Sequence, residues 1–201
     1  MSNRSNVMSI GKRLLPVLLA SAASAPAASA QSVTYAIDPG HTFPAFEADH
    51  MGMSLFRGKF DRNSGTIVLD KAAGTGTVSV DIELASVHFG NPELDKLMAG
   101  PDYFDTAQHP VAHYEGKLAG FVDGKPTRVD GTLTMRGTSQ PVALEIRAFK
   151  CMPHPVFKRD WCGADAYGHF SRAEFGITAG KDWGFSMDTA LRIQVEALAE
   201  K

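Results

Sequence analysis

The sequence has few of the features that mark several large protein classes. It contains 2 cysteines and 2 tryptophans among 201 residues, which excludes a small domain held together by many disulfides. After residue 30, no run approaches the ~18 apolar residues that a membrane-spanning helix needs. Three of the 20 basic residues lie in the first thirty positions. The other 17 stand against 22 acidic residues, which argues against a broad basic face for nucleic acid.

Familiar catalytic motifs are also missing. The sequence has no nucleophile elbow, phosphate-binding loop, dinucleotide-binding glycine motif or H-E-x-x-H zinc motif. Carboxylates are scattered over the polar faces of the expected strands, so no acid–base pair stands out. His109 and His113 would share one face of a strand, which leaves a metal site there as an alternative to two surface side chains. We expect a protein that is not an enzyme and has no resident metal or cofactor.

The first thirty residues have the organisation of a secretory signal peptide. Lys12 and Arg13 precede a leucine-rich stretch, and Ala28-Ser29-Ala30 supplies the small side chains that signal peptidase requires. The apolar stretch is too short, and too rich in alanine and serine, for a membrane anchor. We expect cleavage after Ala30, export to the periplasm, and a single domain over residues 31–201.

The two cysteines, Cys151 and Cys162, lie close together in the sequence. In an oxidising compartment two cysteines separated by a short loop usually pair, so a disulfide is expected. With His154 and His169 they also form a two-cysteine, two-histidine set, so zinc binding is an alternative, although the spacings match no common zinc pattern. Free thiols are a third alternative. Prolines on both sides of His154 predict an irregular loop between the cysteines.

Most of the remaining chain alternates apolar and polar residues with the period of a β-strand. The clearest alternation covers residues 78–84, 142–148 and 191–197. Further strands are expected at 33–37, 46–50, 55–60, 66–70, 111–118, 131–135 and 173–177. Turn signals such as Asn63-Ser64-Gly65 and Asp123-Gly124-Lys125 separate the strands.

One short helix interrupts the strands. Asn91 is suited to cap it, Pro92 fits its first turn, and residues 93–98 form its body. About eight or nine strands in one domain need a closed sheet or two stacked sheets, so we expect an all-β sandwich or up-and-down barrel. The alternating apolar residues would face its interior.

Segments in the same order along the chain carry a resemblance to a known family. They include Ile37–Thr42, Phe46–Gly52, Arg57–Phe60, Pro101–Asp105, Gly131–Thr138 and Arg172–Ile177. The first five read I-D-P-G-H-T, F-E-A-D-H-M-G, R-G-K-F, P-D-Y-F-D and G-T-L-T-M-R-G-T. In the same order they resemble the motifs I-D-P-x-H-S, F-x-V-x-H-L-G, R-G-x-F, P-D-F-F-D and G-x-L-T-x-x-G-x-T of the YceI-like family of secreted, lipocalin-like proteins.

This resemblance implies an extended eight-stranded antiparallel lipocalin-like barrel with one or two short helices. It also implies a binding or carrier protein that holds a long-chain isoprenoid or related amphiphilic lipid, polyprenyl diphosphate or quinone-like, inside the barrel. One alternative is a lipid-modifying enzyme that uses the same cavity. Another is a non-catalytic partner of a membrane redox protein. Transient contact with a membrane protein and a homodimer are both left open.

Strand phase and the family register together predict the site residues. The predicted ligand-lining residues are Phe46, Ala48, His50, Val80, Ile82, Leu84, Leu94, Leu97, Met98, Tyr103, Phe104, Leu133, Phe175 and Ile193. Arg57 and Lys59 flank a glycine and are the candidates to meet an anionic head group through charge-assisted hydrogen bonds; the alternative is that both are exposed charges at a solvated edge. For each apolar residue, the alternative is an ordinary place in the core.

Overall fold

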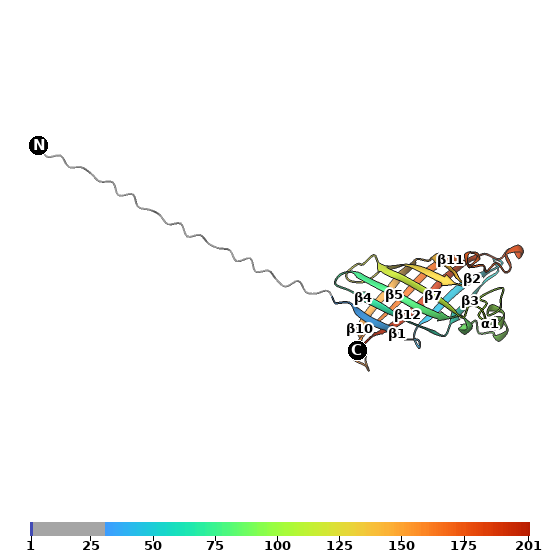
Figure 1. Cartoon of the computed structure of the whole chain (residues 1–201), viewed down its shortest axis with the longest axis horizontal. Helices are drawn as coiled ribbons and strands as arrows, with labels where there is room; N and C mark the ends of the chain where they lie inside the picture. Colours follow the sequence, from blue (N-terminus) through green and yellow to red (C-terminus); the bar gives the residue numbers. More distant parts are fainter. Residues whose placement is uncertain (2–30) are drawn as a thin grey trace.

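The computed structural model describes Met1 and residues 31–201 (Figure 1). The predicted signal peptide and its cleavage site at Ala30 lie outside the described residues. One α-helix, α1 (Pro92–Met98), occurs in the described part of the chain. The strands are β1 (Val33–Ile37), β2 (Phe43–His50), β3 (Ser54–Phe60), β4 (Asn63–Asp70), β5 (Thr75–Glu83), β6 (Val87–His88), β7 (Val111–Ala119), β8 (Arg128–Met135), β9 (Thr138–Pro141), β10 (Leu144–Pro153), β11 (Asp160–Ser171) and β12 (Asp188–Ala199).

Eight of these strands close into an antiparallel barrel. Around the ring they follow the order β1-β4-β5-β7-β8-β10-β11-β12, and β12 pairs back onto β1. Closure gives each ring strand a partner on both sides, which removes the free edges of an open sheet. The predicted all-β, eight-stranded antiparallel barrel is confirmed, and the sandwich alternative is wrong.

The barrel wall continues beyond the ring at one end. The long strand β12 pairs with β1 over Ala197–Ala199, at its C-terminal end, and with β2 over Thr189–Gln194. Strand β2 then pairs with β3, and β3 with β6. At the break between β1 and β2, the Thr42 hydroxyl donates to the Glu196 carbonyl at 3.1 Å and accepts from the Glu196 N–H at 3.0 Å. Strand β12 thereby pairs with both of the shorter strands β1 and β2. The barrel is longer than it is wide (Figure 1).

Helix α1 begins as its sequence predicts. The Asn91 side chain accepts hydrogen bonds from the Glu93 N–H at 3.0 Å and from the Leu94 N–H at 3.4 Å, so it is the N-cap. The segment after the helix is fixed from the β8–β9 turn, where the Arg136 guanidinium donates to the Pro101 carbonyl at 2.8 Å and to the Tyr103 carbonyl. These contacts tie the loop after the helix to the β8–β9 turn, and the Asp95 carboxylate of α1 accepts the Phe89 N–H just after β6 at 2.6 Å.

Two local predictions are wrong. The expected strand at 173–177 is a 3-10 turn over Arg172–Phe175, which ends at Gly176 with φ of 75°. The expected turn at 63–65 lies within β4, because Asn63 already pairs with Ile82. The predicted irregular loop between the cysteines is confirmed at residues 154–159, with β10 ending at Pro153 before it and β11 starting at Asp160 after it.

A β-bulge corrects the predicted phase of β10. The pairing of β10 with β11 shifts register between Ile146 and Ala148. An inserted residue reverses which side chains face inward. Ala148 is therefore exposed instead of inward, while Phe149 and Cys151 pack against the core.

Candidate ligand-binding site

A cavity of about 390 Å³ lies inside the barrel. Every strand of the ring contributes to its wall, and so do β2, β3 and α1. The lining is mostly aliphatic and aromatic, with few polar side chains. Small residues leave the space open where β11 forms the wall, at Gly163, Ala164 and Ala166. The cavity therefore suits a slender apolar molecule.

The cavity is closed at the end that β1 forms. Its wall there includes Tyr35 and Leu69, which are 1% and 2% exposed, together with the buried Pro126 and Cys162. The Tyr35 hydroxyl donates to the Asp160 carboxylate at 2.7 Å. Burial, with the neighbouring Asp160 charge, raises the pKa of the Tyr35 hydroxyl above its ordinary value. This tyrosine therefore stays neutral at physiological pH.

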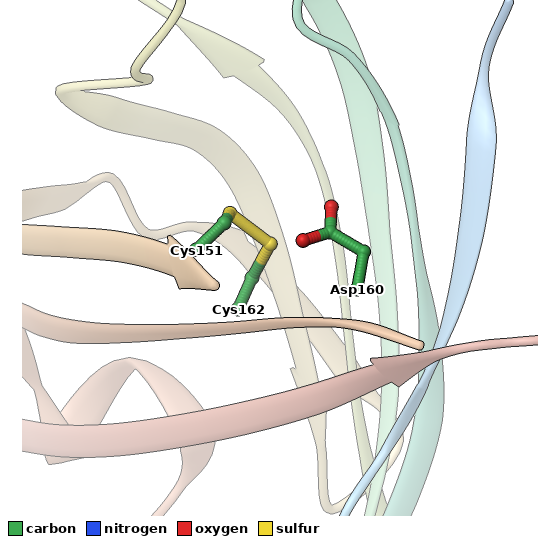
Figure 2. Close-up of side chains that lie close together, drawn as sticks. All are labelled: Cys151, Asp160 and Cys162. Atoms are coloured by element: carbon green, nitrogen blue, oxygen red, sulfur yellow. A yellow bond between two sulfur atoms is a disulfide. The ribbon is translucent and has the colours of Figure 1, made fainter. Parts of the chain in front are cut away.

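A polar cluster and a disulfide lie at this closed end (Figure 2). The Lys71 ammonium donates to Asp160 at 2.7 Å. Burial acts to raise the pKa of Asp160, but hydrogen bonds from Lys71 and Tyr35 and the attraction of Lys71 outweigh it and lower the pKa. Asp160 is therefore an anion that ties β11 to β1 and to the segment after β4.

The disulfide joins Cys151 and Cys162, which are opposite each other in β10 and β11. The predicted pairing is confirmed. Asp160 lies close to both sulfur atoms, and this is the one metal-like group of side chains in the described part of the chain. Because the sulfurs are bonded to each other, neither is a thiolate ligand.

The other metal site considered from the sequence involved His109 and His113. The Nδ1 atom of His113 pairs with the Asp81 carboxylate at 2.7 Å, on the surface.

The opposite end, beyond β2 and β3, is the open one. Leu97 and Phe56 both line the cavity, yet they are 53% and 38% exposed. The His50 ring stacks on Phe56 at a centroid distance of 4.4 Å and meets the edge of Phe185 at 5.0 Å. A lining residue that is also exposed marks a mouth, so the mouth lies between α1, the β2–β3 hairpin and the segment before β12.

The polar lining residues Asp49, His50 and Arg172 lie at this mouth. The Arg172 guanidinium donates to the carbonyls of Ala179 at 2.9 Å and Ile177 at 3.2 Å, and to a third carbonyl at 3.3 Å. Burial lowers its pKa from the ordinary arginine value, although arginine remains charged in proteins. Within the described residues it forms no ion pair with a carboxylate. Its positive charge is thus not neutralised by an acidic side chain among these residues.

Aromatic rings narrow the cavity just inside the mouth. The Phe46 ring lies 5.7 Å from Phe60, 5.5 Å from Phe89 and 6.0 Å from Phe104, measured between centroids. Gly58 makes room for them, because a Cβ atom there would stand 2.7 Å from both the Phe46 and the Phe89 ring. The geometry suits edge-to-face packing against a flat or branched apolar group.

Thirteen of the fourteen predicted lining residues lie in the cavity wall. They are Phe46, Ala48, His50, Val80, Ile82, Leu84, Leu94, Leu97, Met98, Tyr103, Phe104, Leu133 and Ile193. Phe175 is buried outside this wall, where its ring packs edge-on against Phe170 at 5.3 Å. The inward position predicted from strand alternation does not apply to Phe175, because its segment is a 3-10 turn. Ligand contact by the other residues stays a prediction.

The predicted head-group residues do not reach the cavity. Inward positions of β3 hold Phe56 and Phe60, so the alternating Arg57 and Lys59 point outward. The Arg57 Nε atom pairs with Glu47 at 2.8 Å, and the Lys59 Nζ atom pairs with Asp61 at 3.0 Å. Both cations are occupied on the outer face.

Some lining residues were not among the predicted site residues. Tyr35 and Arg172 are the clearest examples. Tyr35 stands at an inward position of the first alternating run, so strand phase could have added it to the lining. Arg172 lies in one of the segments that carry the family resemblance, but nothing local showed that the chain would turn there and place the guanidinium at the mouth.

Comparisons with known proteins agree with this architecture. A UPF0312 protein of Photorhabdus laumondii is 31% identical over 196 residues, which are 94% of this chain and 99% of that protein. The crystal structure of BcnA from Burkholderia cenocepacia aligns with a TM-score of 0.66 at 18% identity, covering 80% of this chain and 99% of that chain. A polyisoprenoid binding domain from Saccharophagus degradans, implicated in plant cell wall breakdown, aligns with a TM-score of 0.61 at 20% identity, covering 84% and 99%.

No helix in residues 31–201 is both long enough and apolar enough to cross a bilayer. The family comparison covers nearly all of that region. The model of the YceI-like domain matches residues 35–197, from the first strand of the barrel to the last. The chain therefore belongs to the YceI-like family.

Proposed function

We propose that this protein is a periplasmic carrier that holds one long-chain isoprenoid or related amphiphilic lipid in its barrel. The observation that carries the proposal is an apolar cavity that is closed at the β1 end and open beyond β2 and β3. The polyisoprenoid binding domain of similar fold in Saccharophagus degradans supports this ligand class. The leader-like residues 1–30 support export, with residues 31–201 as the single mature domain.

The affinity of such a site comes from burial of the chain. Each buried CH₂ group contributes about 0.8 kcal/mol, so a five-carbon prenyl unit contributes roughly 4 kcal/mol before association and ordering costs are subtracted. Apolar contacts are not directional, so the closed end near Tyr35 sets a length limit rather than a chemical preference. The tail would point toward Tyr35 and the polar head group toward the mouth.

At the mouth, the head group would meet Asp49, His50 and Arg172 in place of the outward-facing Arg57 and Lys59. The uncompensated charge of Arg172 favours an anionic or strongly hydrogen-bond-accepting group, such as a diphosphate or a quinone carbonyl. Three backbone carbonyls already orient its guanidinium, and this lowers the entropic cost of binding.

The geometry favours binding over catalysis. The Asp49 carboxylate accepts the Gly52 N–H at 2.9 Å, which closes the β2–β3 turn. The His50 ring is held between Phe56 and Phe185. Within the described residues, these two lining groups form no hydrogen-bonded nucleophile and base pair of the kind that acyl or phosphoryl chemistry uses.

Native mass spectrometry of the protein purified from its own periplasm, followed by solvent extraction, tests the proposal. We expect one co-purifying long-chain lipid per molecule. Ala48→Trp, which fills the cavity behind the mouth, should abolish this species, and the outward-facing Ala148→Trp should retain it. Lipid-free protein that takes up no polyprenyl compound in vitro would refute the carrier function. A mature N-terminus at Gln31 in the periplasmic fraction would support the proposed processing.

A further inference from the structure

We propose that the open end of the barrel docks onto a lipid bilayer through a rim of exposed apolar side chains. The mouth rim consists of Met51, Met53, Leu55, Leu97 and Trp183. The inference rests on the proposed carrier function and extends it to how the lipid reaches the cavity. The rim would insert among acyl chains, so that a lipid tail could pass between membrane and cavity without crossing water.

The rim residues surround the mouth. Met51, Met53 and Leu55 lie between His50 and Phe56, which both line the cavity. Leu97 on α1 lines the cavity itself. Trp183 ends a 3-10 turn, two residues before the lining residue Phe185. In Figure 1 the labels β2, β3 and α1 and the orange-red turn near residue 182 all lie at the end of the barrel away from the C-terminus.

Each rim side chain is exposed, and further exposed apolar side chains lie in the β10–β11 turn at Val156 and Phe157. Trp183 is 75% exposed, Met53 73%, Leu97 53%, Met51 48% and Leu55 46%. They come from three separate segments, so ordinary packing within one element does not explain their common position. Clustered exposed apolar groups of this kind mark an interaction site rather than the scattered apolar surface of any protein.

Two turns display these side chains at a backbone cost. Met51 adopts φ of 59°, a left-handed conformation that side chains other than glycine, asparagine and aspartate rarely adopt. The Trp183 turn is flanked by Gly180 and Gly184, with φ of 81° and 86°. Gly180 also leaves room for the lining residue Phe185, because a Cβ atom there would stand 2.7 Å from the Phe185 ring.

A bilayer fits this rim better than a folded partner does. Tryptophan, methionine and leucine insert into the boundary between head groups and acyl chains, and the adjacent Lys96 and Lys181 can reach the head-group layer. The rim is continuous with a cavity shaped for a lipid tail. The tail could therefore move between the bilayer and the cavity without contact with water. Attraction that depends on apolar insertion should also change little with salt.

The opposite end of the barrel offers a matched control. Val156, in the β10–β11 turn, is 73% exposed, the same value as Met53. It lies beyond the disulfide, at the closed end of the cavity. If docking depended only on exposed apolar area, this valine would contribute as much as a rim residue.

Depth-dependent quenching of tryptophan fluorescence tests the proposal. In a Trp161→Phe background Trp183 is the only tryptophan. With vesicles of phosphatidylcholine and phosphatidylethanolamine, we expect a blue shift of its emission and quenching by lipids brominated on their acyl chains. An unshifted, unquenched Trp183 would overturn the proposal without any rim substitution, so loss of folding cannot mask the result.

Rim variants then measure the contribution of single side chains. Met53→Ser and Trp183→Ser should each weaken vesicle partitioning about tenfold, while Val156→Ser should leave it unchanged. Loading with a detergent-dispersed polyprenyl compound should persist in all three variants, and transfer from vesicles should slow only in the rim variants. Equal partitioning of rim and control variants would refute the docking surface. Failed loading in every protein, wild type included, would instead refute the carrier function.

Discussion

The cavity can be filled from its wall at Ala166, in the middle of β11. This alanine is 5% exposed, lines the cavity, and pairs with Ile146 of β10 and Ile193 of β12. Replacing it with phenylalanine adds about six carbon atoms, roughly the size of one prenyl unit. If a lipid tail passes this level, the lost contacts are worth about 4 kcal/mol, an upper limit near a thousandfold in affinity. We expect at least a tenfold loss after the ligand adjusts.

The unfolding free energy of Ala166→Phe should not fall along with its ligand affinity. In a filled core, an alanine-to-phenylalanine change forces strain that costs about 1–3 kcal/mol. Next to an empty cavity, the new ring enters free space and replaces missing dispersion contacts. We therefore expect the unfolding free energy of lipid-free Ala166→Phe to stay within about 1 kcal/mol of wild type, or to rise.

Two measurements distinguish these cases. Titration with a fluorescent polyprenyl analogue gives the affinity, and urea denaturation of lipid-free protein gives the unfolding free energy. Ala148→Phe, one strand away on the exposed outer face, is the matched control and should preserve both values. The reasoning would be refuted if Ala166→Phe lost several kcal/mol of stability, or if it bound the analogue with wild-type affinity.

Three further predictions concern the two ends of the barrel. The double change Cys151→Ala and Cys162→Ala should lower the unfolding free energy by about 2–3 kcal/mol, because the disulfide closes a short loop; urea denaturation measures it, and an unchanged midpoint would contradict it. Asp160→Ala should cost about 1–3 kcal/mol by leaving the buried Tyr35 hydroxyl without its acceptor. Since the pKa of Asp160 is lowered in the folded protein, the wild-type advantage should hold above pH ~4 and shrink as the pH falls below it; an advantage that grew in acid would be inconsistent with this. Asn91→Ala should destabilise α1 by about 1 kcal/mol, seen as faster amide exchange at Leu94, whereas Asn91→Asp should retain the cap.

Strand phase placed most of the cavity wall correctly because alternation is a local property. In β5, residues Val78, Val80 and Ile82 face inward without interruption, as their alternation predicts. The prediction failed where the phase changes. Ala148 follows a bulge, and Phe175 lies in a 3-10 turn, and neither event has a strong local signal. Both depend on how distant segments pair.

Strand β11 was missed because its inward side chains are small. Cys162, Ala164 and Ala166 alternate with Trp161, Asp165 and Tyr167, but alanine and glycine give a weak apolar signal. The same small residues keep the cavity open along this wall. The feature that weakened the prediction is therefore a structural requirement of the site.

The sequence by itself determined the all-β class, the cap of α1, the predicted cysteine pair and the inward faces of most strands, because each depends on residues close together in the chain. The tertiary structure alone decided which end of the barrel is closed, and that Arg172 rather than Arg57 lies at the mouth. It also brought the β2–β3 hairpin, α1 and the turn Lys181–Trp183 together at one end. These properties arise from ring closure and register between strands far apart in sequence, which a local pattern of apolar and polar residues does not encode.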